Sequence, residues 1–421
     1  MSLEVVRATY LIETPYSLQH AAAVMAGEQS TGTFVAVPGE TDEVKNRSAA
    51  RIISVEEQAV VRSPSLPGAK VPHNHNGDYY RGEVVIEFPF HNFGPSIPNL
   101  LATVAGNLYE LQEFSGLRLM DLELPTAFSA VYPGPKFGVE GTRKLVDVYR
   151  RPIIGTIIKP SIGLTVEELR LLVRELVDAG VDFIKDDELN ASPLFAPLEH
   201  KVKVVMEEIE RAADRTGKKV MYAFNITGDI DELRSNHDIV YHAGGTCVMV
   251  SIQSVGFAGL TYLNRYSQLP IHGHRNQWGM MTRCPLLGME FTAYQKLCRL
   301  AGADHIHVNA LNSKFYESNE SVIRSVQAIQ NPLLGGYATM PVLSSGQSAS
   351  TAEDTYQQLG TYDILNIAGG GIMAHPDGPA AGVKSMQQAW EAAVSGISKD
   401  AYAKEHIELR RALEKFSTTM K

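Results

Sequence analysis

The residue types best suited to chemistry occur together in the run Lys185-Asp186-Asp187-Glu188, which follows a short apolar stretch. Side chains alternate along a strand, so Lys185 and Asp187 should point to the same side, and Glu188 can turn inward where the strand ends. Two converging carboxylates suit Mg²⁺, which prefers oxygen ligands. An ammonium group is not a metal ligand, so Lys185 either forms a salt bridge with the acids or is modified into an oxygen donor. On this motif alone, a solvated loop of mixed charge is the alternative interpretation.

Other ionisable or glycine-rich groups also follow short apolar runs. They are Lys159, the pairs His272/His274 and His305/His307, Arg275, Lys314, Ser344-Ser345-Gly346 and Gly369-Gly370-Gly371. Backbone N–H groups of glycine-rich loops can bind a phosphate, although a turn that needs a positive φ would use glycine as well. Arg275, His307 and Ser344 could bind a second anionic group, the arginine through its planar guanidinium.

The histidines of the two His-x-His pairs face the same side of their strands. We expect His274 and His307 to be functional, whereas His272 and His305 are expected to be packed and hydrogen-bonded. A zinc site is the alternative, but the sequence offers neither a cysteine nor a third nearby ligand for it.

Eight short apolar runs recur from about residue 150 and provide the strands that would position these groups. The runs are 152–158, 181–185, 219–227, 246–251, 270–274, 305–310, 340–344 and 363–367. Helical periodicity separates most of them, and it is clearest at 166–179. This alternation predicts an α/β fold with a closed (β/α)8 TIM barrel, whose active site would lie at the C-terminal ends of the strands. An open doubly wound sheet of similar composition stays the alternative.

The first part of the chain has a different pattern. Strand-like alternation occurs at 5–14 and 82–88, helical stretches at 17–25 and 97–111, and a polar, turn-rich segment at 42–81. We predict a smaller α+β N-terminal domain over 1–140 and a (β/α)8 barrel with C-terminal helices over 141–421. The chain of 421 residues exceeds what one hydrophobic core usually supports, which agrees with two domains.

Charge and composition exclude several classes of partner. The formal net charge is −9 and no basic block occurs, which argues against binding to nucleic acid or to an anionic membrane. Three cysteines form no paired spacing, as is typical of a reducing compartment. Because the sequence has neither an apolar leader nor a long apolar stretch, we expect a cytoplasmic protein.

Taken in order, the motifs resemble the ribulose-bisphosphate carboxylase/oxygenase (RuBisCO) superfamily over essentially the whole chain. The resemblance lies in Gly-Thr-Ile-Ile-Lys-Pro at 155–160, Asp-Phe-Ile-Lys-Asp-Asp-Glu at 182–188, His-Gly-His-Arg at 272–275, His-Ile-His at 305–307, Gly-Gly-Gly at 369–371, His-Pro at 375–376, Glu-Gln-Ser-Thr-Gly-Thr-Phe at 28–34 and Gly-Asn at 106–107.

The resemblance implies that CO₂ carbamylates Lys185, which then binds Mg²⁺ together with Asp187 and Glu188. It makes Lys159 the acid/base lysine, His274 a residue of the site and Lys314 part of a mobile loop. One phosphate site would consist of Arg275, His307 and Ser344, and the other of Thr33, Gly346, Gly369 and Gly370. Glu28, Thr33 and Asn107 would complete the site of a neighbouring subunit, so the implied active unit is a homodimer, which could assemble further.

Departures from the carboxylase pattern are equally informative. The second lysine of the family's Lys-Pro-Lys motif is Ser161 here, and a threonine two residues before Lys159 is Ile157. Phe34 replaces a tryptophan of the phosphate loop, and Ser345 replaces a glycine. Serine cannot supply the positive charge that would meet a developing carboxylate. The pattern therefore resembles a RuBisCO-like protein of the form IV type rather than a true carboxylase.

The retained groups can form an enediolate that Mg²⁺ stabilises. Our leading hypothesis is a carbon–carbon lyase that decarboxylates a phosphorylated 3-oxo sugar acid, such as 3-oxo-isoapionate 4-phosphate. The runner-up is an enolase or isomerase acting on a phosphorylated ketose, as in methionine salvage. A Schiff-base aldolase and a non-catalytic binding barrel are further alternatives, although binding alone requires no acid/base lysine.

Overall fold

The computed structural model describes residues 4–33, 35 and 37–416. It divides into two compact units, one formed by residues up to 133 together with 277–300, the other by 134–276 together with the chain from 301 onward. The segment 277–300 thus belongs to the same unit as the N-terminal part of the chain, so one boundary in the sequence cannot separate the two units. None of the helices in the described residues is long and apolar enough to cross a membrane.

The first unit is built on a mixed sheet with the strand order β10-β4-β1-β3-β2 in its described part. The strands are β1 (Val5–Thr14), β2 (Arg51–Val61), β3 (Tyr79–Pro89), β4 (Gly116–Glu123) and β10 (Leu287–Met289). β10 runs parallel to β4, and the other neighbours are antiparallel. The alternate residues Val6, Ala8, Tyr10 and Ile12 are fully buried, so the period-two pattern of β1 marks its core face.

Helices α1 (Leu18–Glu28), α2 (Asp42–Ser48), α3 (Ile97–Val104), α9 (Trp278–Thr282) and α10 (Phe291–Ala301) complete this unit, with short 3₁₀ turns at Phe90–Asn92, Leu108–Glu110 and Thr126–Ala130. The expectation of one helix over 97–111 is wrong in its extent, because the helix ends before Gly106, which has a φ of 26°. The segment 42–81 holds α2 and β2 as well as turns. Most residues of β2 are exposed, so no buried face produced an alternating pattern that sequence analysis could detect.

The second unit is a closed parallel barrel, as predicted, with the order β11-β12-β13-β5-β6-β7-β8-β9 among the described residues. Its strands are β5 (Ile153–Ile157), β6 (Phe183–Lys185), β7 (Met221–Asn225), β8 (Cys247–Ser251), β9 (Ile271–His274), β11 (His305–His307), β12 (Met340–Leu343) and β13 (Leu365–Ile367). Inward-facing residues such as Ile153, Phe183 and Val342 fill the barrel, so it is a packed core and not a pore.

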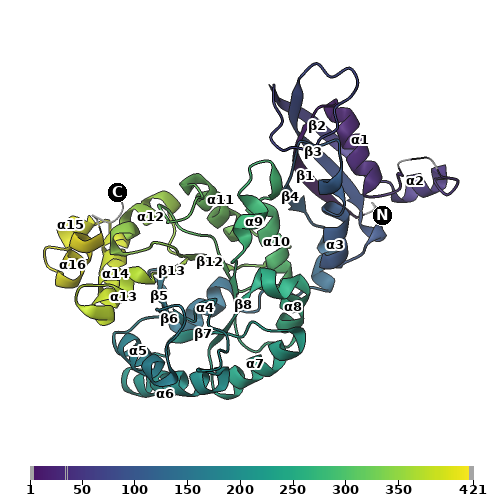
Figure 1. Cartoon of the computed structure of the whole chain (residues 1–421). Helices are drawn as coiled ribbons and strands as arrows, with labels where there is room; N and C mark the ends of the chain where they lie inside the picture. Colours follow the sequence, from purple (N-terminus) through teal and green to yellow (C-terminus); the bar gives the residue numbers. More distant parts are fainter. Residues whose placement is uncertain (1–3, 34, 36, 417–421) are drawn as a thin grey trace. The chain divides into compact units, whose positions relative to one another are not determined.

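Helices α5 (Val166–Asp178), α6 (Leu198–Thr216), α7 (Ile230–His242) and α8 (Ile252–Tyr266) lie outside the ring of strands (Figure 1). The remaining helices are α4 (Gly138–Val146), α11 (Asn319–Gln330), α12 (Ala352–Leu359), α13 (Gly370–Met373), α14 (Gly378–Val394), α15 (Lys399–Tyr402) and α16 (Ile407–Phe416), and a 3₁₀ turn spans Ala349–Thr351. The predicted helix at 166–179 is confirmed as α5, which begins with a capping box between Thr165 and Glu168. Parallel pairing brings the C-terminal ends of all the strands to one mouth, and this arrangement positions the site.

Candidate active site

Lys185 is the last residue of β6 and lies on the same face of the strand as Phe183, which is part of the barrel core. Its side chain has no exposed surface, and Nζ donates a hydrogen bond to the backbone oxygen of Asp186 at 2.7 Å. Burial lowers the pKa of Lys185 to about 8, although the nearby carboxylates of Glu188 and Asp187 oppose this shift. Part of this amine is therefore neutral and nucleophilic near neutral pH.

Asp186 faces the opposite side of β6 and is held by three donors. Its carboxylate accepts hydrogen bonds from Tyr222 Oη at 2.7 Å, the backbone N–H of Asn225 at 3.0 Å and Lys201 Nζ at 3.2 Å. Lys201 comes from α6 and is only 1% exposed, so this is a buried ion pair. Asp186 thus fixes the end of β6 while the residues on either side of it face the barrel mouth.

Asp187 contacts Lys159, which follows the end of β5. Lys159 Nζ lies 2.7 Å from Asp187 Oδ2 and 2.8 Å from Ser161 Oγ. Ser161, which stands where the carboxylase pattern has a second lysine, therefore helps to orient the lysine that remains. The Lys159 side chain keeps 38% of its surface exposed, so it can still meet a substrate at the mouth.

Glu188 lies beside His274 at the end of β9, with Oε2 3.5 Å from Nε2. This histidine holds the pKa of Glu188 below its usual range, whereas burial lowers the pKa of His274. At neutral pH the pair is therefore a carboxylate beside a neutral imidazole. The buried Nδ1 of His274 has no hydrogen-bond partner within the described part of the chain. The side-chain amide of Asn225 donates to the backbone oxygens of Asp187 and Glu188, which ties this loop to β7.

These groups fit a hard divalent cation only in part as they stand. Among the described residues, no group of three or more His, Cys, Asp and Glu side chains is placed to hold a metal. The mouth instead offers the carboxylates of Asp187 and Glu188 beside the buried amine of Lys185. Conversion of that amine into an oxygen donor would supply the third ligand, so the chemistry of the donor set fits Mg²⁺ with a modified lysine.

Three of the histidines form a hydrogen-bonded chain inside the barrel. His307 Nε2 lies 2.8 Å from His272 Nε2, and His272 Nδ1 lies 3.3 Å from His305 Nδ1. The chain ends at Thr142 Oγ1, 2.8 Å from His305 Nε2, and at Ser344 Oγ, 3.0 Å from His307 Nδ1. Burial lowers the pKa of all three histidines, that of His305 to about 3, so the rings are neutral at physiological pH.

Arg275 is paired with an acid that the sequence analysis did not identify. Its Nη2 lies 2.7 Å from Glu317 Oε2, and the side chains of Arg275 and Glu317 are only 4% and 7% exposed. Glu317 also accepts hydrogen bonds from Asn309 and from Ser321 Oγ. This carboxylate follows Lys314 by three residues, but no local pattern in the sequence connects it with an arginine 42 positions earlier.

The glycines predicted to bind phosphate follow β12 and β13. Gly346 has a φ of +72°, a conformation that favours glycine, and a Cβ there would lie 3.4 Å from the backbone nitrogen of Lys314. A Cβ on Gly369 would contact Lys159 Cε at 3.5 Å, whereas one on Gly370 would meet no described atom within 4 Å. The two loops therefore lie beside Lys314 and Lys159 and leave space open above Gly370.

Residues predicted to serve a neighbouring subunit lie in the first unit. Asn107 Nδ2 donates to Glu28 Oε1 at 3.4 Å, so two of them are neighbours. Thr33 hydrogen-bonds to the backbone oxygen of Val35 and to Glu40. Phe34 lies outside the described residues.

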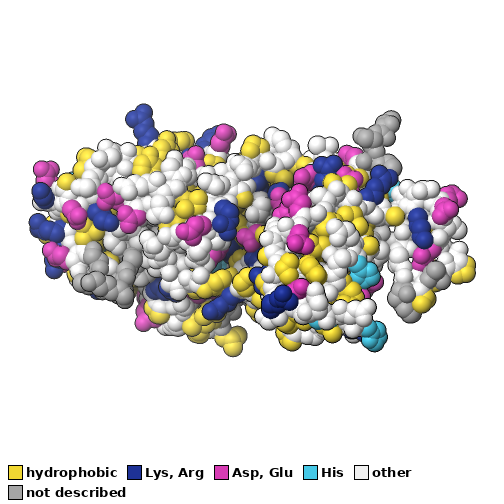
Figure 2. All heavy atoms as spheres, turned by 90° about the horizontal axis from the view of Figure 1, so that it is seen from above, with side chains coloured by type: hydrophobic (Ala, Val, Ile, Leu, Met, Phe, Trp, Pro, Cys, Tyr) yellow, Lys and Arg dark blue, Asp and Glu magenta, His cyan; other side chains and the backbone are white. Residues whose placement is uncertain are grey.

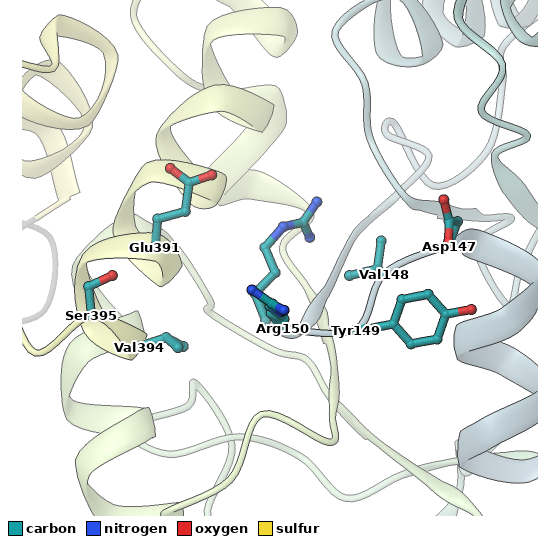
Figure 3. A pocket seen from close by; sticks show the side chains of 8 residues that line it. Asp147, Val148, Tyr149, Arg150, Glu391, Val394 and Ser395 are labelled. Atoms are coloured by element: carbon teal, nitrogen blue, oxygen red, sulfur yellow. The ribbon is translucent and has the colours of Figure 1, made fainter.

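A surface cavity of about 460 Å³ lies at the other end of the barrel. It is lined by residues 147–151, which precede β5, and by residues of α14 and its C-terminus, and it includes none of the groups above (Figure 3). Basic and acidic side chains are interspersed on the face seen in Figure 2.

Two family models match successive parts of the chain. The model described as "Ribulose bisphosphate carboxylase large chain, catalytic domain" matches residues 138–416, and the corresponding N-terminal domain matches residues 4–128. The chain belongs to the RuBisCO large-chain family.

Relatives within this family differ in name from the carboxylases. A protein of Xanthobacter autotrophicus named 3-oxo-isoapionate-4-phosphate transcarboxylase/hydrolase is 50% identical, with 97% of this chain and 99% of the relative covered. A protein of Rhizobium etli named 3-oxo-isoapionate-4-phosphate decarboxylase is 45% identical, with 97% and 98% covered. The crystal structure of a RuBisCO-like protein from Burkholderia fungorum matches with a TM-score of 0.91 at 46% identity, covering 98% of this chain and 99% of that one.

The buried pair of Asp186 and Lys201 generates a stability prediction. Lys201→Ala should lower the free energy of unfolding by about 3 kcal/mol or more, because the Asp186 carboxylate stays buried without its cation. Urea unfolding followed by circular dichroism measures this change. Lys203→Ala is the matched control, since Lys203 is exposed on the same helix and should cost little. Equal unfolding midpoints for the two variants would show that the pair does not hold the loop.

Proposed function

We propose that this RuBisCO-like protein is a Mg²⁺-dependent decarboxylase of a phosphorylated 3-oxo sugar acid, such as 3-oxo-isoapionate 4-phosphate. The observation that carries the proposal is the placement of Lys159, whose ammonium is oriented by Asp187 and Ser161 while remaining partly exposed at the mouth. A single proton donor without a second lysine suits loss of CO₂ better than its addition. Relatives with 45–50% identity over nearly the full chain carry names that include this substrate.

The metal would be held by Asp187, Glu188 and the carbamate of Lys185. When bound, Mg²⁺ supplies positive charge where the ketone oxygen of a substrate develops negative charge. The contact with His274 holds the pKa of Glu188 below its usual range, so this carboxylate is ionised and could bind the metal. Gly346, Gly369 and Gly370 would bind the phosphate through backbone N–H groups, next to Lys314 and Lys159.

Decarboxylation places a defined demand on Lys159. The bond between the carboxyl carbon and its neighbour breaks, CO₂ leaves, and the electron pair moves onto the ketone oxygen to form an enediolate. Lys159 then donates its proton from Nζ to carbon, and solvent restores that proton. The contacts with Asp187 and Ser161 orient Nζ for this transfer.

Two other reactions use the same first intermediate. The Xanthobacter relative, at 50% identity, is named a transcarboxylase/hydrolase, which favours a second candidate in which the carboxyl group is transferred and not released. An enolase or isomerase would only move protons on a phosphorylated ketose. The three reactions differ in the fate of the carbon–carbon bond. A decarboxylase releases the carboxyl group as CO₂, a transcarboxylase keeps it in an acid product, and an isomerase breaks no carbon–carbon bond.

An assay with 3-oxo-isoapionate 4-phosphate and Mg²⁺ tests the proposal directly. We expect stoichiometric release of CO₂, and a loss of about 10²–10⁴-fold in kcat for Lys159→Met, because the proton donor is removed. Lys203→Met, which changes an exposed lysine, should retain full activity. Formation of an acid product without gas would favour the transcarboxylase. Solvent deuterium exchange into a ketose phosphate without CO₂ release from any 3-oxo acid would favour the isomerase.

Carbamylation of Lys185 can be tested without substrate. Incubation with ¹³C-bicarbonate and Mg²⁺ should give a carbamate resonance that is absent in Lys185→Met and retained in Lys203→Met. Carbamylation needs the neutral amine, and with a pKa of about 8 the neutral fraction should rise from pH 6.5 to pH 8.5. An unchanged resonance in Lys185→Met would assign the carbamate to another amine.

We further propose a cytoplasmic homodimer in which Glu28, Thr33 and Asn107 of one subunit complete the site of the other. Under this arrangement, Asn107→Leu and Lys159→Met should each be inactive as pure dimers. Co-expressed hybrids purified through two different tags should regain about half of the wild-type activity, because one of their two sites is intact. Hybrids as inactive as their parents would indicate that each site lies within one chain.

A further inference from the structure

The second anion-binding position at the barrel mouth, predicted at Arg275, His307 and Ser344, has a buried acid beside it. We infer that Glu317 is a specificity-determining residue: by pairing with Arg275 it makes this position suitable for a hydroxyl-bearing end of the substrate and not for a second phosphate. The inference rests on the proposed function, in which the substrate is a sugar acid with one phosphate, and it adds which residue selects against a second phosphate.

The first support is the ion pair itself. Arg275 Nη2 and Glu317 Oε2 lie 2.7 Å apart, and both side chains are almost fully buried. Asn309 and Ser321 donate further hydrogen bonds to Glu317, so its carboxylate is fixed from several sides. A phosphate dianion at Arg275 would have to displace this carboxylate or lie next to it, and the repulsion is strong where water is excluded.

The second support is the direction of the histidine chain. The hydroxyl of Thr142 donates to the carbonyl oxygen of Gly138, which can only accept. Thr142 Oγ1 must therefore accept from His305 Nε2–H, which leaves Nδ1 of this neutral ring as an acceptor. His272 Nδ1–H then donates to His305, so His272 Nε2 is also an acceptor.

The same logic reaches the mouth at His307. Its Nε2–H donates to His272 Nε2, and its Nδ1 accepts the hydroxyl proton of Ser344. Ser344 therefore presents oxygen lone pairs at this position, and His307 uses its N–H inside the barrel. These two residues suit a hydroxyl that donates, whereas a phosphate dianion brings only acceptors.

The other anion-binding position, which is lined by glycines, differs in that its carboxylate, Asp187, contacts a lysine, Lys159, that keeps 38% of its side-chain surface exposed. Gly346 lies next to the backbone of Lys314, and Gly369 lies next to the side chain of Lys159. The asymmetry between the two positions predicts a substrate with one phosphate, oriented with that phosphate at the glycine loops.

Binding of two commercially available sugar phosphates tests the role of Glu317. Isothermal titration of the full-length protein, with Mg²⁺ and bicarbonate present, would compare ribulose 5-phosphate with ribulose 1,5-bisphosphate. We expect the wild type to bind the bisphosphate no more tightly than the monophosphate. Glu317→Gln should tighten binding of the bisphosphate on the order of tenfold and leave the monophosphate nearly unchanged, because it removes the charge and keeps the shape.

Glu320→Gln is the matched control, since Glu320 is an exposed acid three residues further along the chain and should leave both affinities unchanged. Glu317→Ser gives a second test if the glutamine variant folds poorly. A wild type that prefers the bisphosphate, or variants at 317 that leave the preference unchanged, would overturn the inference. A wild type that binds neither compound would overturn both this inference and the proposal that the substrate is a phosphorylated sugar acid. Binding of the monophosphate without CO₂ release in the decarboxylase assay would contradict only the proposed reaction.

Discussion

A lysine with no exposed surface at the end of a barrel strand is the constraint on which the site depends. Removing an ammonium from water is costly unless acids surround it or it gives up its proton. Both occur at Lys185, where Asp187 and Glu188 stabilise the charge and burial still lowers the pKa to about 8. The same residue is thereby chemically reactive near neutral pH and surrounded by the carboxylates that a metal ion requires.

Three consecutive acids could not all face that lysine, and the alternation of a strand separates them. Asp186 points outward, where Lys201, Tyr222 and the backbone of Asn225 satisfy its carboxylate. These contacts of Asp186 fix the orientation of the end of β6, so Lys185 and Asp187 face the barrel and Asp186 cannot. A structural ion pair on one side of the strand is therefore what orients the reactive groups on the other.

Much of this arrangement could be predicted from the sequence because it follows from local periodicity. The strand positions and the helix at 166–179 came from period two and period 3.6, and the barrel rule then placed Lys159, Lys185, Asp187 and His274 at one mouth. The position of Lys201 in the sequence also indicates a buried partner, since this lysine lies on the apolar face of α6 between Leu198 and Val205. A lysine at such a position is seldom buried without an acid beside it.

Glu317, Thr142 and the grouping of 277–300 with the first unit could not be predicted in this way. Each depends on contacts between distant segments: Arg275 with Glu317, and His305 with Thr142 across 163 positions. β2 was missed for another reason, because an edge strand with most of its residues exposed has no buried face to impose alternation. The periodicity of a sequence indicates which face of its own helix or strand is buried. Contacts between distant segments across the barrel depend on the topology of the fold.

Pairing across the barrel also determines which cations at the mouth can act on a substrate. Arg275 is almost fully buried and already neutralised by Glu317, whereas Lys159 keeps 38% of its side-chain surface exposed despite its contact with Asp187. A buried pair is strongly coupled because little water screens it, and a half-exposed one exchanges partners more readily. The positive charge of Lys159 can thus interact with a substrate at the mouth, whereas that of Arg275 is neutralised by Glu317. The motifs, whose resemblance to the family implied two phosphate sites, could not distinguish these two states, because the distinction lies in a carboxylate outside every motif.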